Sequence, residues 1–191
     1  LDNLKTCLDV GANVGLFSLY LLNRNCQNIY SLEPCEASYP TLTALFGNTS
    51  NVTCYKLAMC KKNGKVTLNT SEQNSTISTI LKDYNEKSNT YEGKEVCKSV
   101  TLESFLENES INSLDLIKLD IEGCEYDIIE YTKDDILLKS KRYLVEYHEL
   151  GQKKMNSMLS KFKRLGYTLY NTFDPNYIKD FGTFFAHKKW E

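Results

Sequence analysis

Polar and charged residues that could bind a ligand follow the first two apolar runs of the sequence. The segment Asp9–Gly15 (DVGANVG) ends the first run, and Glu33 ends the second. Glycine lets the chain turn sharply and lets a ligand approach the backbone, because it has no Cβ. A carboxylate at the end of a second strand can accept hydrogen bonds from both ribose hydroxyls. We therefore predict a nucleoside cofactor site that comprises Asp9, Gly11, Asn13, Gly15 and Glu33.

The spacing within this loop separates two kinds of nucleoside cofactor. Dinucleotide-binding loops read Gly-x-Gly-x-x-Gly and leave a helix N-terminus free for the pyrophosphate. Here the loop reads Gly-x-x-x-Gly and follows Asp9. A carboxylate there would repel a pyrophosphate and attract a sulfonium with an ammonium group. The pattern favours S-adenosylmethionine over NAD; the alternative is a turn without a ligand, with Asn13 capping the next helix and Glu33 on the surface.

A second charged group follows the most apolar run of the chain, Leu114–Ile121. Lys118, Asp120 and Glu122 alternate, so in a strand they would share one face. Charges at the end of a buried strand cost desolvation energy unless they are paired or used. We expect Asp120 beside the reactive part of the cofactor, and Lys118 and Glu122 in the substrate pocket. The alternative is an ion-pair network, with Glu122 and Glu125 at a helix N-terminus.

The next expected strand, Arg142–Tyr147, carries Glu146 and leads directly to His148. Imidazole titrates near neutral pH, so His148 can act as the base that deprotonates an attacking hydroxyl. Glu146 could orient His148 or contact the substrate. The alternative is a histidine that is only hydrogen-bonded at a strand end. Asp120, Glu122, Glu146 and His148 offer ligands that a divalent metal could use, but their spacing is not diagnostic and a metal is not favoured.

Short apolar runs alternate with amphipathic segments of helical length, which is typical of an α/β fold with a doubly wound, mostly parallel sheet. We expect strands at Leu4–Val10, Asn28–Leu32, Val52–Met59, Lys65–Asn69, Leu114–Ile121 and Arg142–Tyr147. We expect helices at Leu16–Asn23, Ala37–Phe46, Glu125–Tyr131 and Lys153–Leu165. The last strands, Tyr167–Asn171 and Thr183–His187, have no helix between them and predict an antiparallel hairpin at one edge.

In this order, the motifs resemble those of the FkbM family of class I methyltransferases, which have a Rossmann-like fold. The family's glycine loop matches Asp9–Gly15, its Glu-Pro matches Glu33-Pro34, its acidic segment with Glu-Gly-x-Glu matches Asp115–Glu125, and its Glu-x-His matches Glu146–His148. The resemblance covers nearly the whole chain. It implies an S-adenosylmethionine-dependent O-methyltransferase acting on a hydroxyl of a sugar or other small molecule, with Ala58 beside the adenine.

Two further features leave the function open. The stretch Ser71–Glu95 is polar with weak periodicity, so it is either disordered or a loop over the site from which Ser75 and Ser78 could reach the substrate. The chain could also be a catalytically silent module of the same fold that acts as an interaction or regulatory domain. Such a module would bind the cofactor without turnover, or bind nothing.

The composition narrows the class of protein. With 191 residues and 41% apolar side chains, we expect one domain over residues 1–191. The net charge of −2 argues against a nucleic-acid partner, which needs a basic face, and no apolar run is long enough to span a bilayer. A small-molecule or glycan substrate remains as the expected partner, and the oligomeric state is not readable.

The cysteines and the ends of the sequence bear on its location. The seven cysteines contain no Cys-x-x-Cys pair and favour reduced, mostly buried thiols in a cytoplasmic compartment. Asn-x-Ser/Thr sequons point the other way, because they are acceptors for glycosylation in secreted proteins. The sequence begins without Met and lacks the segment usually found upstream in the family. We therefore expect an excerpt, which leaves upstream targeting open.

Overall fold

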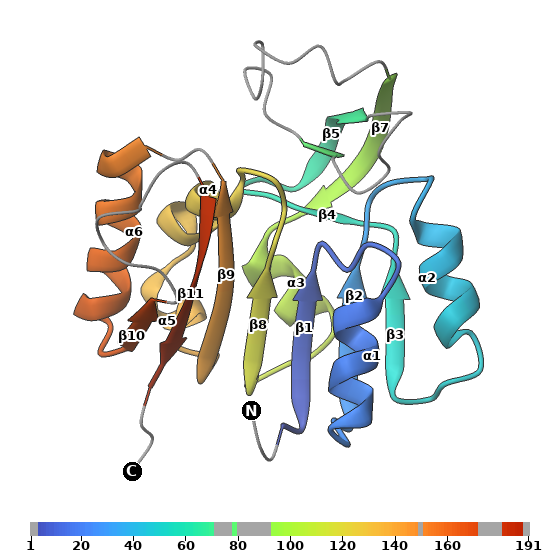
Figure 1. Cartoon of the computed structure of the whole chain (residues 1–191), viewed down its shortest axis with the longest axis horizontal. Helices are drawn as coiled ribbons and strands as arrows, with labels where there is room; N and C mark the ends of the chain where they lie inside the picture. The colour runs from blue at the N-terminus through green and yellow to red at the C-terminus, as the bar shows by residue number, and fades with distance from the viewer. Residues whose placement is uncertain (1–3, 71–77, 80–92, 149–150, 172–180, 189–191) are drawn as a thin grey trace.

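A seven-stranded sheet forms the centre of the molecule (Figure 1). The computed structural model describes residues 4–70, 78–79, 93–148, 151–171 and 181–188. Across the sheet the strand order is β10-β11-β9-β8-β1-β2-β3. The strands are β1 (Thr6–Val10), β2 (Asn28–Leu32), β3 (Val52–Tyr55), β8 (Leu116–Leu119), β9 (Arg142–His148), β10 (Thr168–Asn171) and β11 (Phe181–His187). β11 pairs antiparallel with both β10 and β9, and the other described pairs of this sheet are parallel, so the doubly wound, mostly parallel sheet with an antiparallel edge is confirmed.

Helices cover both faces of this sheet, as its alternating strands require. They are α1 (Leu16–Asn23), α2 (Tyr39–Phe46), α3 (Leu102–Asn108), α4 (Glu125–Tyr131), α5 (Asp134–Leu137) and α6 (Gly151–Arg164). One hydrophobic cluster joins α1 and α2 to side chains such as Cys7 and Leu116. Another cluster joins the four helices α3, α4, α5 and α6 to Leu8 and Ile117. These two residues are the next positions along β1 and β8, so their side chains point to the opposite face of the sheet. Each strand of the pair β1–β8 is therefore buried on both sides.

A second, four-stranded sheet lies beyond the carboxyl ends of β1 and β2 (Figure 1). Its order is β4 (Ala58–Met59), β7 (Gly93–Val100), β5 (Gly64–Thr70) and β6 (Ser78–Thr79). The expected strand Val52–Met59 is wrong as one element, because the chain leaves the main sheet after Tyr55 and β4 pairs with β7 instead. The expected polar loop is likewise wrong at Ser78–Thr79 and Gly93–Glu95, where pairing with β5 satisfies the backbone.

Helix α3 was not predicted, although its sequence carries a start signal. Leu102, Phe105 and Leu106 are buried and share the spacing of one helical face. Thr101 is the N-cap residue, and its side-chain oxygen accepts a hydrogen bond from the Ser104 amide at 3.2 Å. The hydroxyl satisfies an amide that has no partner within the helix.

Thr101→Ala should therefore lower the free energy of unfolding by about 1 kcal/mol, because the first turn of α3 loses its side-chain cap. Urea unfolding monitored by circular dichroism measures this change. Thr101→Ser keeps the hydroxyl and is the matched control. Equal loss of stability in the two variants would show that the cap does not stabilise the helix.

Most of the cysteine side chains are buried, as expected. Cys54 and Cys60 are partly exposed, and the other five are buried. The Sγ atoms of Cys7 and Cys26 lie 3.4 Å apart, and burial of Cys54 and Cys60 raises the pKa of each thiol. These thiols pack as apolar side chains.

Candidate functional site

The glycine loop after β1 turns tightly against the ends of two neighbouring strands. The amides of Gly11 and Ala12 both donate to the Leu32 carbonyl at 3.0 Å, which ties the loop to the end of β2. Gly11 has φ +77°, and a Cβ there would lie 1.8 Å from the Asp120 carbonyl oxygen. Gly15, at φ +96°, faces the ring of Phe46 in α2, where a Cβ would lie 2.7 Å from it. Gly11 thus permits a close approach to the end of β8, whereas Gly15 permits helix packing.

Glu33 is held in a fixed position at the carboxyl end of β2. Its side chain is buried, with Oε2 accepting from the Asn13 amide and Oε1 from the Cys35 amide, both at 2.8 Å. Burial raises the pKa of Glu33, against the lowering effect of these two amides. The alternative of a surface glutamate is therefore wrong. Asn13 does not cap α1 either, since Gly15 is the N-cap residue and no side chain caps the helix.

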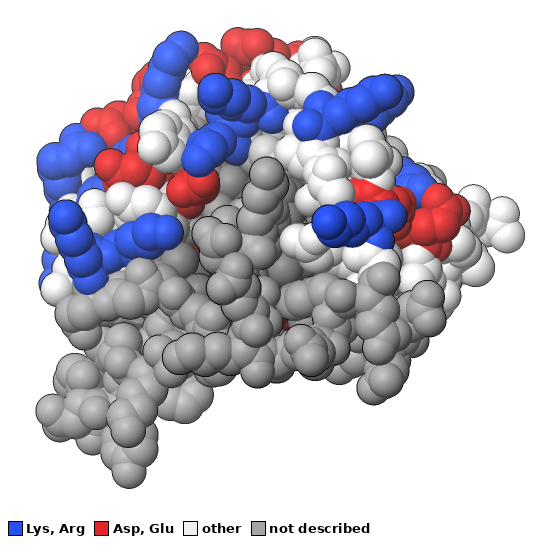
Figure 2. Space-filling model, turned by 90° about the horizontal axis from the view of Figure 1, so that it is seen from above, with Lys and Arg blue, Asp and Glu red and all other residues white. Residues whose placement is uncertain are grey.

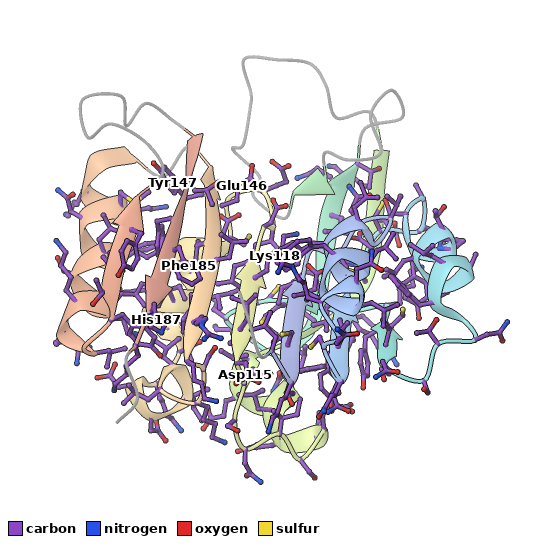
Figure 3. All side chains as sticks on the ribbon, turned by 60° about the horizontal axis from the view of Figure 1, so that its bottom comes forward. Asp115, Lys118, Glu146, Tyr147, Phe185 and His187 are labelled. Atoms are coloured by element: carbon purple, nitrogen blue, oxygen red, sulfur yellow. The ribbon has the colours of Figure 1, made fainter. Side chains whose placement is uncertain are left out.

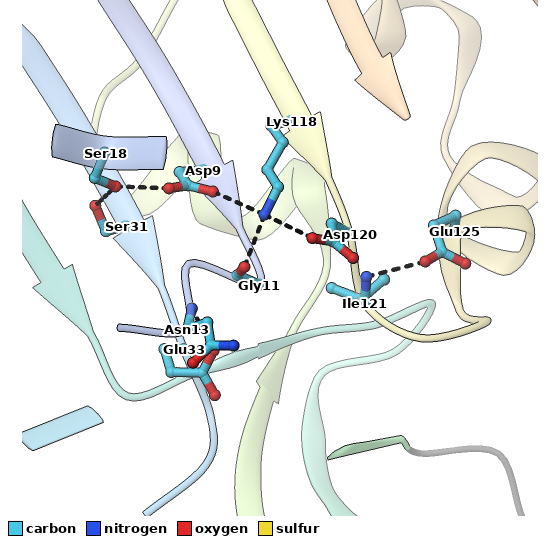
Figure 4. Close-up of polar contacts among 10 residues, drawn as sticks. All are labelled: Asp9, Gly11, Asn13, Ser18, Ser31, Glu33, Lys118, Asp120, Ile121 and Glu125. Carbon is cyan, nitrogen blue, oxygen red and sulfur yellow. Dashed lines mark hydrogen bonds and ion pairs between the residues drawn. The ribbon is translucent and has the colours of Figure 1, made fainter. Parts of the chain in front are cut away.

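Asp9 and Lys118 face each other across the paired strands β1 and β8 (Figure 4). The Lys118 ammonium lies 3.4 Å from Asp9 Oδ1 and 3.1 Å from Asp120 Oδ2, and it donates to the Gly11 carbonyl at 2.8 Å. Ser18 Oγ donates to Asp9 Oδ2 at 2.6 Å. Burial lowers the pKa of Lys118, but the two carboxylates outweigh it and the pKa is raised. Asp9, fully buried, therefore has its charge offset by Lys118.

The acidic segment after β8 forms a turn and not a continued strand. The strand ends at Leu119, and Glu122 lies in the turn with φ +53°, so Glu122 does not share a strand face with Lys118 as expected. The buried carboxylate of Glu125 accepts from the Ile121 amide at 2.9 Å and from the Gly123 amide at 3.0 Å. These hydrogen bonds take the place of strand pairing and fix the turn.

These elements enclose a cavity at the carboxyl edge of the sheet. Seven of the predicted site residues line it: Gly11, Asn13, Glu33, Ala58, Asp120, Glu122 and Glu146. Its volume is about 220 Å³, below the roughly 300–1,000 Å³ of most ligand pockets. Lysine, arginine and acidic side chains are interspersed on the described part of the face seen from above (Figure 2).

The cavity also has lining residues that the sequence did not single out. Met59 and Leu68 come from the second sheet, and Pro34 and Ser38 follow Glu33. Of these four residues, only Pro34 belongs to a motif named from the sequence, the Glu-Pro motif. The apolar residues give the cavity one wall without charge.

The remaining predicted residues lie elsewhere or outside the described residues. Asp9, Gly15 and Lys118 do not line the cavity. His148 is the last residue of β9, and its side chain lies outside the described part, as does that of Ser78 in β6. Ser75 lies wholly outside the described residues.

Glu146 and His187 lie toward opposite ends of the neighbouring strands β9 and β11 (Figure 3). His187 pairs with Arg142 at the start of β9, whereas Glu146 lies near the end of β9 and lines the cavity. Among the described residues, no group of three or more His, Cys, Asp or Glu side chains is arranged to hold a metal. No helix within the described ranges has the length and apolar character to cross a bilayer.

Two solved structures with the same fold were determined with S-adenosyl-homocysteine. TrmK of M. capricolum, solved with S-adenosyl-homocysteine, is 13% identical with a TM-score of 0.55, and the match covers 99% of this chain but only 64% of that one. The N-terminal domain of EvdMO1, solved with S-adenosyl-homocysteine and D-fucose, is 9% identical with a TM-score of 0.55, over 98% of this chain and 77% of that one. At such identities the likeness shows the fold alone.

The sequence itself gives the decisive comparison. A search of curated proteins finds no match. The methyltransferase FkbM domain, however, matches residues 9–169, which run from the start of the glycine loop into β10. This range contains Glu33, the acidic turn and the end of β9, so every motif of the cavity lies within the matched domain. The chain therefore belongs to the FkbM family of S-adenosylmethionine-dependent methyltransferases.

Proposed function

We propose that this domain transfers the methyl group of S-adenosylmethionine to a hydroxyl of a sugar or other small molecule. The observation that carries the proposal is the division of the cavity into two halves. The strands at the cavity lie in the order β9-β8-β1-β2. Gly11, Asn13 and Glu33 follow β1 and β2 in one half, whereas Glu122 follows β8 and Glu146 lies near the end of β9 in the other, with Asp120 between them. Carboxylates accept hydrogen bonds from hydroxyl groups, so the second half suits an acceptor rich in hydroxyls.

The residues of the first half fit the cofactor. Glu33 has both oxygens oriented by backbone amides and keeps lone pairs that can accept from the ribose hydroxyls. Ala58, Met59 and Leu68 offer an apolar wall for the adenine, and the bare backbone at Gly11 lets the cofactor approach. Asp120, 29% exposed at its side chain, can accept from the cofactor's ammonium group.

The cofactor supplies an electrophilic methyl group, so the protein mainly has to align the acceptor and exclude water. We assign His148 as the base that takes the proton from the acceptor hydroxyl. Glu146 either orients His148 or binds the acceptor. His148 lies two positions after Glu146 on β9. The EvdMO1 structure, solved with D-fucose, supports a sugar as the acceptor.

Methyl transfer to a panel of neutral sugars and small alcohols, followed by mass spectrometry of the products, tests the proposal. Once an acceptor is found, His148→Ala should lower kcat by about 10²- to 10⁴-fold and leave the Kd of S-adenosyl-homocysteine unchanged, because a base acts on the acceptor and not on the cofactor. His187→Ala is the matched control, at the far end of the neighbouring strand. Cofactor binding without methylation of any hydroxyl would contradict the proposal and favour a silent module.

A further inference from the structure

Lys118 places a buried positive charge next to residues that line the cavity. Its side chain is only 11% exposed, and its ammonium contacts Asp9, Asp120 and the carbonyl of Gly11 (Figure 4). It does not line the cavity, but Asp120, at 3.1 Å, does. Lys118 is thus one carboxylate removed from the ligand, which is too close for solvent to screen its charge fully.

The surrounding charges are otherwise negative. Asp9 is fully buried beside Lys118, Asp120 is partly exposed, and Glu33 is buried close enough for the Lys118 charge to lower its pKa. One ammonium therefore offsets part of the field of three carboxylates. A net negative field favours a cationic ligand, so Lys118 sets how strong that preference is.

The cofactor and its product differ in the charge on their sulfur atom. S-adenosylmethionine has a positively charged sulfur, whereas in S-adenosyl-homocysteine the sulfur is neutral; the adenine, the ribose and the amino-acid groups are the same. The ratio of their dissociation constants therefore reports the electrostatic field at the sulfur. A general loosening of the site weakens both ligands and leaves the ratio unchanged.

We propose that Lys118 is a positioning and specificity-determining residue that fixes the glycine loop through Gly11 and limits the preference of the site for the sulfonium cofactor over the thioether product. The contact with the Gly11 carbonyl holds the loop at the point where it meets the cavity. Offsetting Asp9 and Asp120 keeps the field at the sulfur from becoming strongly negative. This role replaces the substrate contact expected for Lys118 from the sequence.

Calorimetry of Lys118→Met with each ligand tests the inference without any acceptor. Removing the ammonium should weaken both ligands through the loop and also shift the ratio of dissociation constants about fivefold toward S-adenosylmethionine, the size expected for a unit charge near a partly buried site. Lys118→Arg keeps the charge and should keep the ratio of the unaltered domain. An unchanged ratio in Lys118→Met, with both ligands weakened equally, would overturn the inference.

Two further variants keep the test decisive if Lys118→Met does not fold. Asp120→Asn removes a negative charge from the same ion pair and should shift the ratio the opposite way, toward S-adenosyl-homocysteine; no shift would overturn the inference. The matched control is Lys141→Met, because Lys141 pairs with Asp115 at 2.6 Å at the other end of the sheet (Figure 3). The control should leave the ratio unchanged. Failure of the inference leaves the proposed hydroxyl acceptor untouched, since no acceptor is present.

Discussion

Gly11→Ala should abolish measurable binding of S-adenosylmethionine and lower the free energy of unfolding by about 3 kcal/mol or more. The new Cβ would lie 1.8 Å from the Asp120 carbonyl oxygen, a backbone atom that no rotamer change can move. Relief therefore requires separation of the glycine loop from the end of β8, and both segments line the cavity. Calorimetry and urea unfolding of the same preparation measure the two effects.

Gly166→Ala is a control that separates two effects of Gly11→Ala: the contact of the new Cβ with the Asp120 carbonyl, and the strain of a side chain at positive φ. Gly166 has φ +85°, close to the +77° of Gly11, but its Cβ would meet only the flexible side chain of Lys188 at 3.7 Å. This control should lose only about 1–2 kcal/mol and bind the cofactor normally. If Gly11→Ala loses no more stability than Gly166→Ala and still binds, the close approach of loop and strand is not required.

Glu33→Ala should weaken binding of S-adenosyl-homocysteine at least about a hundredfold, because it removes two charge-assisted hydrogen bonds of about 1.5–3 kcal/mol each. The substitution removes the proposed acceptor of both ribose hydroxyls. It also leaves the amides of Asn13 and Cys35 without the carboxylate that orients the loop. Calorimetry measures the change in affinity. Glu33→Gln keeps the shape of the side chain but loses its charge, so its affinity should fall between those of the unaltered domain and Glu33→Ala.

The neighbouring acid Glu36 provides the control for Glu33. Its side chain is 72% exposed and pairs with Lys56, so Glu36→Ala should leave the affinity unchanged. Unaltered affinity in Glu33→Ala, with the domain folded, would show that the carboxylate does not bind the ribose. The cofactor would then have to be held from the other side of the cavity.

The sequence predicted the main sheet because its strands carry a local signal. The apolar runs at Thr6–Val10 and Asn28–Leu32, and the helix Glu125–Tyr131, lie where their periodicity placed them. Strand β5 was expected at Lys65–Asn69, but the second sheet as a unit was missed, because β7 alternates exposed with buried residues and pairs with β5 across a long intervening stretch. Such pairing gains its stability from contacts distant in sequence, which no local window contains.

The candidate site was also predictable only in part. Gly11 and Glu33 stand at strand ends, where the fold alone places a ligand site, and the structure brings them to one cavity. The role of Lys118 was not readable, because its contact with the Gly11 carbonyl joins residues 107 positions apart. The alternation of Lys118 with Glu122 suggested a shared face, but a positive φ at Glu122 turned the chain away.

The second sheet has a small hydrophobic cluster of its own, whose buried members are Ala58, Leu68 and Cys97. Within the described residues, Met59 and Val100 of this sheet pack in the main hydrophobic cluster instead, so few buried apolar side chains hold the rest of it. We expect that part to open at a lower free energy than the main sheet, which is buried on both faces. Ala58 and Leu68 also form one wall of the cavity. We therefore expect product to exchange for fresh cofactor through local opening of this wall, while the strands that carry the glycine loop and Lys118 stay folded.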